Sequence, residues 1–270
     1  MQFTKALITG ASSGIGEALC HLLAQQGIEL CLTGRNEKRL QRLQADLQHH
    51  VPTSYFVADI ATPEGRQKVS ARIGEFVPDL LINNAGFGLY GDALTYDSDV
   101  QAEIVQVNVV AALEFMLAAG RSLISCQKKG VILNVSSSAA FEILPSFAVY
   151  TASKAFINSC SQSLDFEMRP YGVRVLAACP GMVKTAFADR AAGGEVLSRD
   201  QDEISMSPAF AAQAIWKQIQ QAKPLHIFDW RYRLMVEISR FIPKKWVAWF
   251  LKKSIEKRYP KRAFKSGPKG

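Results

Sequence analysis

Short apolar runs alternate with helical stretches along most of this 270-residue chain. The apolar runs lie at 6–9, 29–33, 54–58, 80–83, 131–135, 173–178 and 225–228. The helical stretches lie at 14–27, 37–48, 63–76, 98–122, 149–169 and 207–221. Because continuous apolar strands that alternate with helices are buried on both faces, the pattern predicts one α/β domain. We expect a doubly wound parallel sheet of about seven strands with helices on both faces.

The first apolar run ends in a glycine-rich loop that opens the first helix, Thr9-Gly10-Ala11-Ser12-Ser13-Gly14-Ile15-Gly16. Glycines at these positions permit a tight turn and a close approach of a ligand to the backbone. The helix N-terminus adds unpaired N–H groups and a positive dipole, which favour a pyrophosphate. A glycine cluster by itself also fits an ordinary turn, but the order of strand, loop and helix favours nucleotide binding.

Tyr150 and Lys154 stand four residues apart in the 149–169 helix and therefore share one of its faces. A tyrosine has an ordinary pKa of about 10, so it exchanges protons poorly at neutral pH unless a positive charge stabilises the phenolate. The lysine supplies that charge, and the pair suits acid–base catalysis of carbonyl–alcohol chemistry. Taken alone, such a pair is also common in helices as a purely structural feature.

Three further motifs lie where apolar runs end, which is where open α/β sheets bind ligands. They are Asn83-Asn84-Ala85-Gly86, Asn134-Val135-Ser136-Ser137-Ser138 and Cys179-Pro180-Gly181-Met182-Val183-Lys184-Thr185. With the T-G-x-x-x-G-I-G loop and the Y-x-x-x-K pair, and in this order, the motifs resemble those of the short-chain dehydrogenase/reductase family. The resemblance covers residues 4–228 and implies a Rossmann-type fold.

The resemblance implies a catalytic set of Asn108, Ser137, Tyr150 and Lys154. The Ser137 hydroxyl would orient a substrate carbonyl and stabilise negative charge that develops on its oxygen. Asn108, inside the 98–122 helix, would help to hold a water that connects Lys154 to solvent. From the residues alone, the serines also fit hydrogen bonding at a strand end, and Asn108 fits a side chain bonded to a backbone carbonyl.

The resemblance also implies a set of cofactor-binding residues, to which Tyr150 and Lys154 belong. The others are Gly10, Ser12, Ser13, Gly14, Ile15, Gly16, Arg35, Asp59, Ile60, Asn83, Ala85, Gly86, Pro180, Gly181, Val183 and Thr185. In the family, Asp59 would contact the adenine amino group, whereas the bare sequence equally allows it to cap the following turn. No ligand spacing predicts a metal site, and we expect none.

The end of the second apolar run indicates which cofactor binds. In dinucleotide folds a carboxylate here binds the ribose 2′-hydroxyl of NAD, and a nearby arginine accommodates the 2′-phosphate of NADP. This chain has Gly34 where the acid is expected, followed by Arg35. Because a guanidinium group can hold a phosphate with two hydrogen bonds, we predict NADP(H). The alternative for Arg35 is a solvated loop residue.

The segment 186–206 is polar and too long for an ordinary connection, so it predicts a substrate lid. It contains Phe187, Met206 and a double glycine at 193–194. Apolar residues that could form the walls of a substrate pocket are Leu89, Tyr90, Phe141, Ile143 and Leu144, although each also fits an ordinary core position. This apolar bias favours a hydrophobic carbonyl substrate.

The net charge of +8 is concentrated near the C-terminal end. Residues 231–270 carry 13 Lys and Arg and 2 Asp and Glu, a net of +11, whereas residues 1–230 carry a net of −3. We therefore divide the chain into a catalytic domain, 1–228, and a basic helical tail, 229–270, whose last residues we expect to be disordered. The basic charge thus says nothing about polyanion binding by the catalytic domain.

Pro243 divides the tail into two helical segments and would stand in the first turn of the second. On a helical wheel, one side of the second segment carries Trp246, Val247, Phe250, Leu251 and Ile255, whereas Trp249 falls outside this arc. A basic amphipathic helix with tryptophans suits contact of 231–258 with an anionic membrane surface. Packing on the body or in an oligomer is the alternative, and nucleic acid is the least favoured partner.

The sequence thus predicts an NADP(H)-dependent oxidoreductase that interconverts a hydrophobic carbonyl compound and its alcohol. One alternative is a 3-oxoacyl-thioester reductase, whose acidic carrier protein the tail would recruit. An alternative of another class is a nonenzymatic, NADP-binding scaffold on membranes. The scattered cysteines indicate a reducing compartment, and the N-terminus lacks a signal-peptide pattern. We expect a cytoplasmic homodimer or homotetramer, peripheral at the membrane surface.

Overall fold

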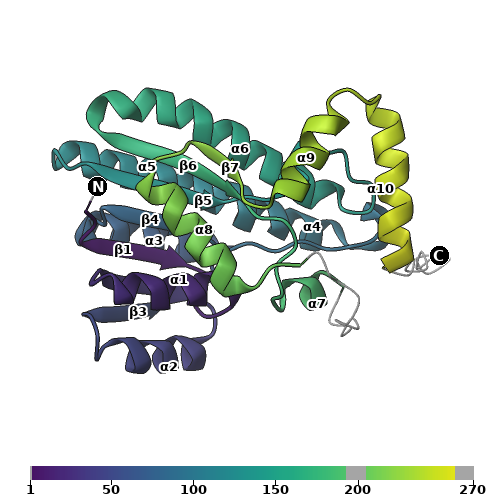
Figure 1. The fold of residues 1–270 in the computed structure, drawn as a ribbon. Coiled ribbons are helices and arrows are strands. Elements are labelled where there is room, and N and C mark those ends of the chain that lie inside the picture. Colours follow the sequence, from purple (N-terminus) through teal and green to yellow (C-terminus); the bar gives the residue numbers. More distant parts are fainter. Residues whose placement is uncertain (1, 193–204, 259–270) are drawn as a thin grey trace.

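The computed structural model describes residues 2–192 and 205–258, and for 254–258 it describes the backbone alone. Its centre is a seven-stranded sheet whose neighbouring strands are all parallel. The strands are β1 (Lys5–Thr9), β2 (Glu29–Gly34), β3 (Thr53–Val57), β4 (Leu80–Asn83), β5 (Gly130–Val135), β6 (Val173–Cys179) and β7 (Leu225–Ile227). Their order across the sheet is β3-β2-β1-β4-β5-β6-β7, which confirms the predicted doubly wound fold (Figure 1).

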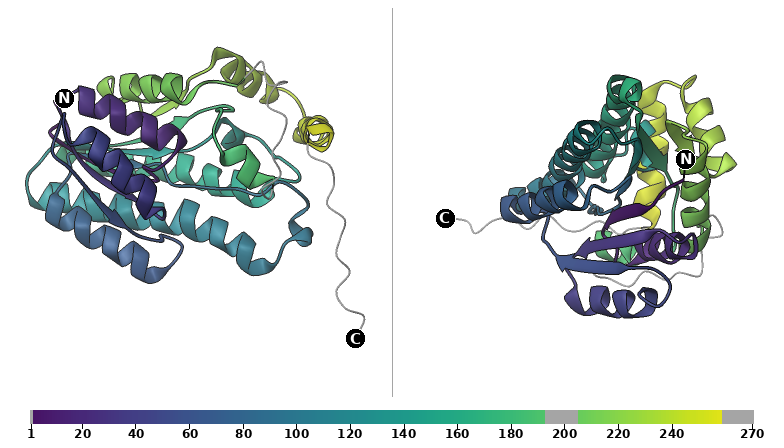
Figure 2. Two further views of the ribbon diagram at one scale, coloured as in Figure 1. Left: turned by 90° about the horizontal axis from the view of Figure 1, so that it is seen from below. Right: turned by 90° about the vertical axis from the view of Figure 1, so that its left-hand side faces the viewer.

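Helices cover both faces of this sheet, as the alternation predicted (Figure 2). One face carries α1 (Gly14–Gln25), α2 (Glu37–Leu47) and α8 (Pro208–Gln220). The other carries α3 (Pro63–Phe76), α5 (Ala112–Ser125) and α6 (Ala148–Met168). Successive side chains of a strand point to opposite faces, so the neighbours Leu7 and Ile8 of β1 belong to different apolar cores.

The predicted 98–122 helix is interrupted in its middle. It consists of α4 (Ser98–Val105), a π-helical turn at Gln106–Ala111 that contains Asn108, and α5. The whole stretch Ser98–Ser125 is long and apolar enough to cross a membrane by length and composition alone. Its second half, α5, nevertheless packs against the sheet, where Phe115 and Met116 are fully buried.

The remaining helices gather where the strands end (Figure 1). They are α7 (Phe187–Ala191) and the two tail helices, α9 (Trp230–Ser239) and α10 (Lys244–Arg258). Three 3₁₀ helices lie at Ala93–Thr95, Ser138–Phe141 and Arg169–Tyr171. Pro243 separates α9 from α10, but it directly precedes α10 instead of lying in its first turn, and its carbonyl accepts the N–H of Trp246 at 2.9 Å.

A buried carboxylate fixes α6 to β6. Asp165 is 1% exposed and accepts hydrogen bonds from Nε of Arg174 at 2.7 Å, Nη2 of Arg169 at 2.6 Å and the N–H of Val175 at 2.9 Å. Burial by itself would raise the pKa of Asp165, but these hydrogen bonds outweigh it and hold the pKa below its usual value. The contact therefore sets the position of α6 and of the side chains that α6 carries.

We expect Asp165→Asn to lower the free energy of unfolding by about 2–3 kcal/mol at neutral pH, because two partly exposed guanidinium groups lose their carboxylate. Since the pKa is lowered in the folded state, the stabilisation is complete above the unfolded pKa of about 4 and is lost as the pH falls through the folded pKa. Urea unfolding at several pH values measures the free energy of unfolding of the wild type and the variant. The control is Glu237→Gln, which removes a carboxylate from the exposed ion pair with Arg240. If Asp165→Asn lowers the free energy of unfolding no more than Glu237→Gln does, the stabilising role of Asp165 is contradicted.

Candidate active site

A deep cavity lies at the edge where β1, β4, β5 and β6 end. The strand order reverses between β1 and β4, and such a switch point leaves a crevice outside the strand ends. The cavity has a volume of about 730 Å³. It extends from the Gly10 loop, past the start of α6, to Tyr232 and Met235 of α9.

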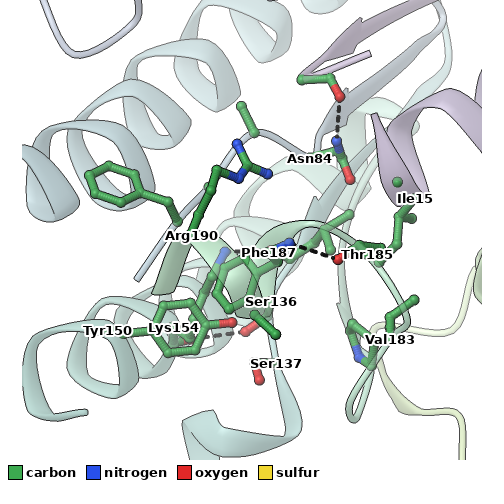
Figure 3. A pocket seen from close by; sticks show the side chains of 18 of the residues that line it. Ile15, Asn84, Ser136, Ser137, Tyr150, Lys154, Val183, Thr185, Phe187 and Arg190 are labelled. Carbon is green, nitrogen blue, oxygen red and sulfur yellow. Dashed lines mark hydrogen bonds between the residues drawn. The ribbon is translucent and has the colours of Figure 1, made fainter. Parts of the chain in front are cut away.

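Three of the predicted catalytic side chains converge on the wall of this cavity (Figure 3). Nζ of Lys154 donates to the carbonyl of Val135 at 2.8 Å and lies 5.8 Å from the centre of the Tyr150 ring. The Ser137 hydroxyl lies close enough to Tyr150 to act on the pKa of its phenol. Ser137 also accepts the N–H of Ala139 at 3.1 Å, which starts the 3₁₀ helix after β5. A phenol, a hydroxyl and an ammonium group therefore face one place.

Burial moves the pKa values of the two titratable groups in opposite directions. It raises the pKa of Tyr150 to about 12, although the hydrogen bond with Ser137 acts to lower it. It lowers the pKa of Lys154 to about 8. The sequence suggested that Lys154 would lower the pKa of Tyr150, but in this structure desolvation of the phenol is the larger effect. Tyr150 therefore carries its proton at neutral pH, and the pKa of Lys154 lies close to neutral pH.

Asn108 lies behind the cavity wall. Its Oδ1 accepts the N–H of Phe87 at 3.1 Å, and its Nδ2 donates to the carbonyl of Phe87 at 2.9 Å and to Oγ of Ser153 at 3.0 Å. A Cβ at Gly86 would lie 3.1 Å from both Oδ1 of Asn108 and Nζ of Lys154, so only a glycine there leaves both groups in place. A water relay through Asn108 stays a prediction.

The glycine loop forms the opposite end of the cavity. Gly10 has a φ of +65°, and a Cβ there would lie 2.9 Å from Cα of Ala85. The loops after β1 and β4 therefore pack backbone against backbone, which a side chain would prevent. Ser13 precedes α1 without a described side-chain bond to the first turn, so the N–H groups there can bind an anion. These features fit the pyrophosphate of a dinucleotide.

Most of the predicted cofactor residues line the cavity. They are Gly10, Ser12, Ser13, Gly14, Ile15, Arg35, Asp59, Ile60, Ala85, Gly86, Tyr150, Lys154, Pro180, Gly181, Val183 and Thr185. Asn83 and Gly16 are not among the lining residues. Asn83 is buried in the sheet, where its Nδ2 donates to Oδ1 of Asn134 at 2.8 Å. Its neighbour Asn84 lines the cavity instead. Asp59 also accepts the N–H of Ala61 at 3.1 Å, as a turn cap would.

Three arginines from separate elements meet at the end of the cavity near β2. Arg35 follows β2, Arg39 lies on α2, and Arg190 comes from α7. Burial and then the charges of Arg35 and Arg39 lower the pKa of Arg190, so the three guanidinium groups repel one another. Nη1 of Arg35 lies 3.5 Å from Oε1 of Glu103, in an exposed pair. Sequence analysis missed Arg190, because no spacing connects α7 with β2.

The first part of the predicted lid covers the Tyr150 ring. The ring of Phe187 on α7 lies beside that of Tyr150 (Figure 3), and the two ring centres are 5.4 Å apart. The N–H of Tyr90 donates to the carbonyl of Ala191 at 2.8 Å, which ties α7 to the loop after β4. Residues 193–204, including the double glycine, lie outside the described residues. Of the five predicted pocket-wall residues, Tyr90 and Leu144 line the cavity.

The first tail helix packs on the catalytic body and closes the site. A Cβ at Gly181 would collide with the Tyr232 ring, and Oη of Tyr232 accepts the N–H of Met182 at 3.3 Å. Val236 is buried in a cluster with Cys179 and Ile227. For α9, packing on the body, one of the two expected alternatives, is therefore observed. Membrane contact of the tail stays a prediction.

Comparison with known proteins places the chain in a family. Residues 4–195 match the sequence profile of the short chain dehydrogenases. The chain belongs to the short-chain dehydrogenase/reductase family. An uncharacterized oxidoreductase of Staphylococcus saprophyticus is 33% identical over 221 residues, which cover 79% of this chain and 92% of the relative. This short-chain dehydrogenase/reductase is thus an oxidoreductase of CH–OH and C=O groups.

Solved structures agree with this assignment. A short-chain dehydrogenase from Sphingobium yanoikuyae in complex with NADPH is 28% identical and has a TM-score of 0.77, covering 83% of this chain and 87% of its own. A family member from Burkholderia phymatum in complex with NAD, 23% identical with a TM-score of 0.78, covers 88% of this chain and 93% of its own and shares the fold. Nicotinamide cofactors thus bind to similar structures, in both the phosphorylated and the unphosphorylated form.

The two shifted pKa values predict how activity depends on pH. On the predicted roles, reduction of a carbonyl uses the Tyr150 proton and an ammonium group at Lys154 that stabilises the resulting phenolate. Because the Lys154 pKa is about 8, we expect kcat/KM for reduction to fall as the pH rises through about 8. Cofactor affinity measured over the same range separates binding from chemistry. A kcat/KM that stays level well above this pH would contradict the assignment.

Proposed function

We propose that this enzyme is an NADP(H)-dependent reductase of hydrophobic ketones or aldehydes that also catalyses the reverse oxidation. The observation that carries the proposal is the convergence of Ser137, Tyr150 and Lys154 on a cavity that joins the glycine loop to the apolar side chains of α9. The first end suits a dinucleotide and the second suits an apolar compound, and the acid–base group lies between them.

Each polar group of the site has a distinct role in this reaction. When bound, the nicotinamide cofactor supplies a hydride for the carbonyl carbon. Tyr150 donates its proton to the carbonyl oxygen, and Ser137 orients that oxygen through its hydroxyl group. Lys154, held by the Val135 carbonyl, stabilises the resulting phenolate by its charge. The rings of Phe147 and Phe187 on either side of Tyr150 exclude water from this proton transfer.

The arginine cluster supports the choice of NADP(H). A 2′-phosphate would relieve the repulsion among Arg35, Arg39 and Arg190, whereas a ribose hydroxyl would not. Oγ of Ser12 would lie 3.3 Å from a Cβ at Gly34, so a larger side chain there, such as the carboxylate that binds a ribose hydroxyl, would press on Ser12. The same end of the site thus favours a phosphate.

Replacement of the acid–base group tests the enzymatic proposal. We expect Tyr150→Phe to lower kcat for reduction of a hydrophobic ketone by about 10²–10⁴-fold, because the proton donor is lost. Affinity for NADPH should persist, since the phenyl ring still fills the site. Tyr171→Phe, at an exposed position, is the matched control. Undiminished turnover by Tyr150→Phe would overturn the assignment, as would a cellular role that survives it unchanged.

Substitution of Arg35 tests the cofactor choice. We expect Arg35→Ala to weaken NADPH binding about tenfold and to leave NADH binding unchanged, because the lost charge-assisted hydrogen bonds reach only the 2′-phosphate. Arg190→Ala should act in the same direction. Arg42→Ala, an exposed arginine of α2 outside the cavity wall, is the control in fluorescence titrations with both cofactors. Equal losses for NADPH and NADH, or no loss for either, would refute the role of Arg35.

A further inference from the structure

A second cavity lies beside the first, between α9 and α10. Its volume is about 550 Å³, and Figure 1 shows the two helices that enclose it at the carboxyl end of the strands. Besides Ser239, six side chains line this cavity and not the catalytic one, and all six are apolar or aromatic. They are Trp230, Leu234, Ile238, Ile242, Trp246 and Val247.

The two cavities share part of their walls. Glu142, Arg231, Met235, Phe250 and Leu251 line both. Because the glycine loop and the arginine cluster occupy the far end of the catalytic cavity, a substrate beside Tyr150 can extend toward α9 and α10. The second cavity is therefore an extension of the substrate site.

The α10 side of this extension is the apolar arc of an otherwise basic helix. Trp246 and Phe250 remain 66% and 67% exposed although they line the cavity, and Lys244 and Lys245 beside them are exposed. Large apolar side chains that lie exposed side by side usually mark a binding site. An aliphatic chain in the cavity would cover it and remove both surfaces from water.

Glu142 lies where the two cavities meet, a place called the neck below. Its carboxyl group is buried, and one oxygen accepts a hydrogen bond from the Ser239 hydroxyl of α9. No residue in the described part of the chain donates to the other oxygen, Oε2, which is also buried. A buried acceptor without a donor is costly, so this oxygen points to a ligand that brings an O–H or N–H group to the neck.

We propose that the cavity between α9 and α10 binds the aliphatic chain of the substrate, and that Oε2 of Glu142 accepts a hydrogen bond from a hydroxyl or amide group on it. This proposal rests on the proposed function and narrows its substrate class to long-chain, amphiphilic carbonyl compounds and alcohols. In this arrangement the reacting carbonyl carbon lies beside Tyr150, and the aliphatic chain of the substrate lies between α9 and α10.

The wild-type enzyme provides the first test and needs no variant. NADPH consumption is measured with methyl ketones of short, medium and long chain length. We expect KM to fall by up to about fourfold for each CH₂ group that enters the cavity, and then to become constant when the cavity is full. A KM that does not change with chain length would overturn the proposal.

A pair of matched variants tests whether the second cavity causes the dependence on chain length. Val247→Asp places a charge in the second cavity, in the first turn of α10, where an acidic residue is compatible with the helix. Val100→Asp makes the same change in the first turn of α4, outside both cavities. We expect Val247→Asp to reduce the ratio of kcat/KM for long to short ketones by about tenfold or more and Val100→Asp to preserve it. An unchanged ratio in Val247→Asp would overturn the proposal.

A binding measurement separates this inference from the reaction. Trp230 and Trp246 line the cavity, so a long-chain alcohol brominated near the end of its chain should quench their fluorescence in the full-length protein. We expect quenching of the wild type and of Val100→Asp and at least about tenfold weaker binding to Val247→Asp. Quenching by vesicles of a brominated anionic phospholipid, without quenching by the alcohol, would overturn the proposal in favour of a bilayer.

The role of Glu142 is tested by Glu142→Gln, which keeps an acceptor for Ser239 but turns the second oxygen into a donor. The wild type should bind the brominated alcohol more tightly than its methyl ether, which has no donor. Glu142→Gln should abolish or reverse this preference. The same preference in the wild type and the variant would overturn the role of Glu142.

The two possible failures differ in their results. If no ketone of any length is reduced but the alcohol still quenches the tryptophans, the proposed function fails and the chain-binding cavity stands. If short ketones are reduced but neither KM nor quenching depends on chain length, the proposed function stands and this inference fails.

Discussion

The site depends on the contact of α6 with the end of β5. Lys154 reaches the Val135 carbonyl through Nζ, and its own carbonyl accepts the hydroxyl of Ser136 at 3.1 Å. Two turns further along, Ser161 accepts a hydrogen bond from Asn134 at 2.9 Å. These buried bonds fix both the rotation and the height of the helix. Tyr150 lies on the same face of α6 one turn before Lys154, so its place beside Ser137 follows from the place of Lys154.

Two parts of the chain contribute to the site in different ways. The strands and the loops that follow them fix the glycine loop, Ser137 and Lys154, all of which belong to the buried body. The apolar end is built by α7, α9 and α10, which carry the exposed large apolar residues Met235, Trp246 and Phe250. The contact of Tyr232 with Gly181 joins these parts, so the tail can influence the substrate without any change in the catalytic group.

Much of the fold could be predicted from the sequence, because each strand is a continuous apolar run and each helix has apolar residues at regular spacing. The catalytic residues could be placed because Tyr150 and Lys154 share one helix and Ser137 follows one strand. Contacts between distant segments could not be predicted in this way. Arg190 joins Arg35 only through the lid, and Tyr232 reaches Gly181 only because α9 folds back across the strand ends.

Local geometry explains the other differences. The π-helical turn at Asn108 is a local change of hydrogen bonding within the long 98–122 stretch, and the apolar spacing of that stretch did not predict it. Of the doublet Asn83 and Asn84, the sequence interpretation placed Asn83 on the cavity wall, but Asn83 bonds within the sheet and Asn84 lines the cavity. The pKa of Tyr150 depends on its burial, to which Phe187 contributes from the distant α7.

The most direct test of the central claim is isotope transfer. Purified full-length enzyme is incubated with a hydrophobic ketone and NADPH that carries deuterium at the transferable position, and the alcohol is analysed by mass spectrometry. The account predicts deuterium on the carbinol carbon with the wild type and almost none with Tyr150→Phe. Product without deuterium, or equal labelling by both proteins, would contradict it.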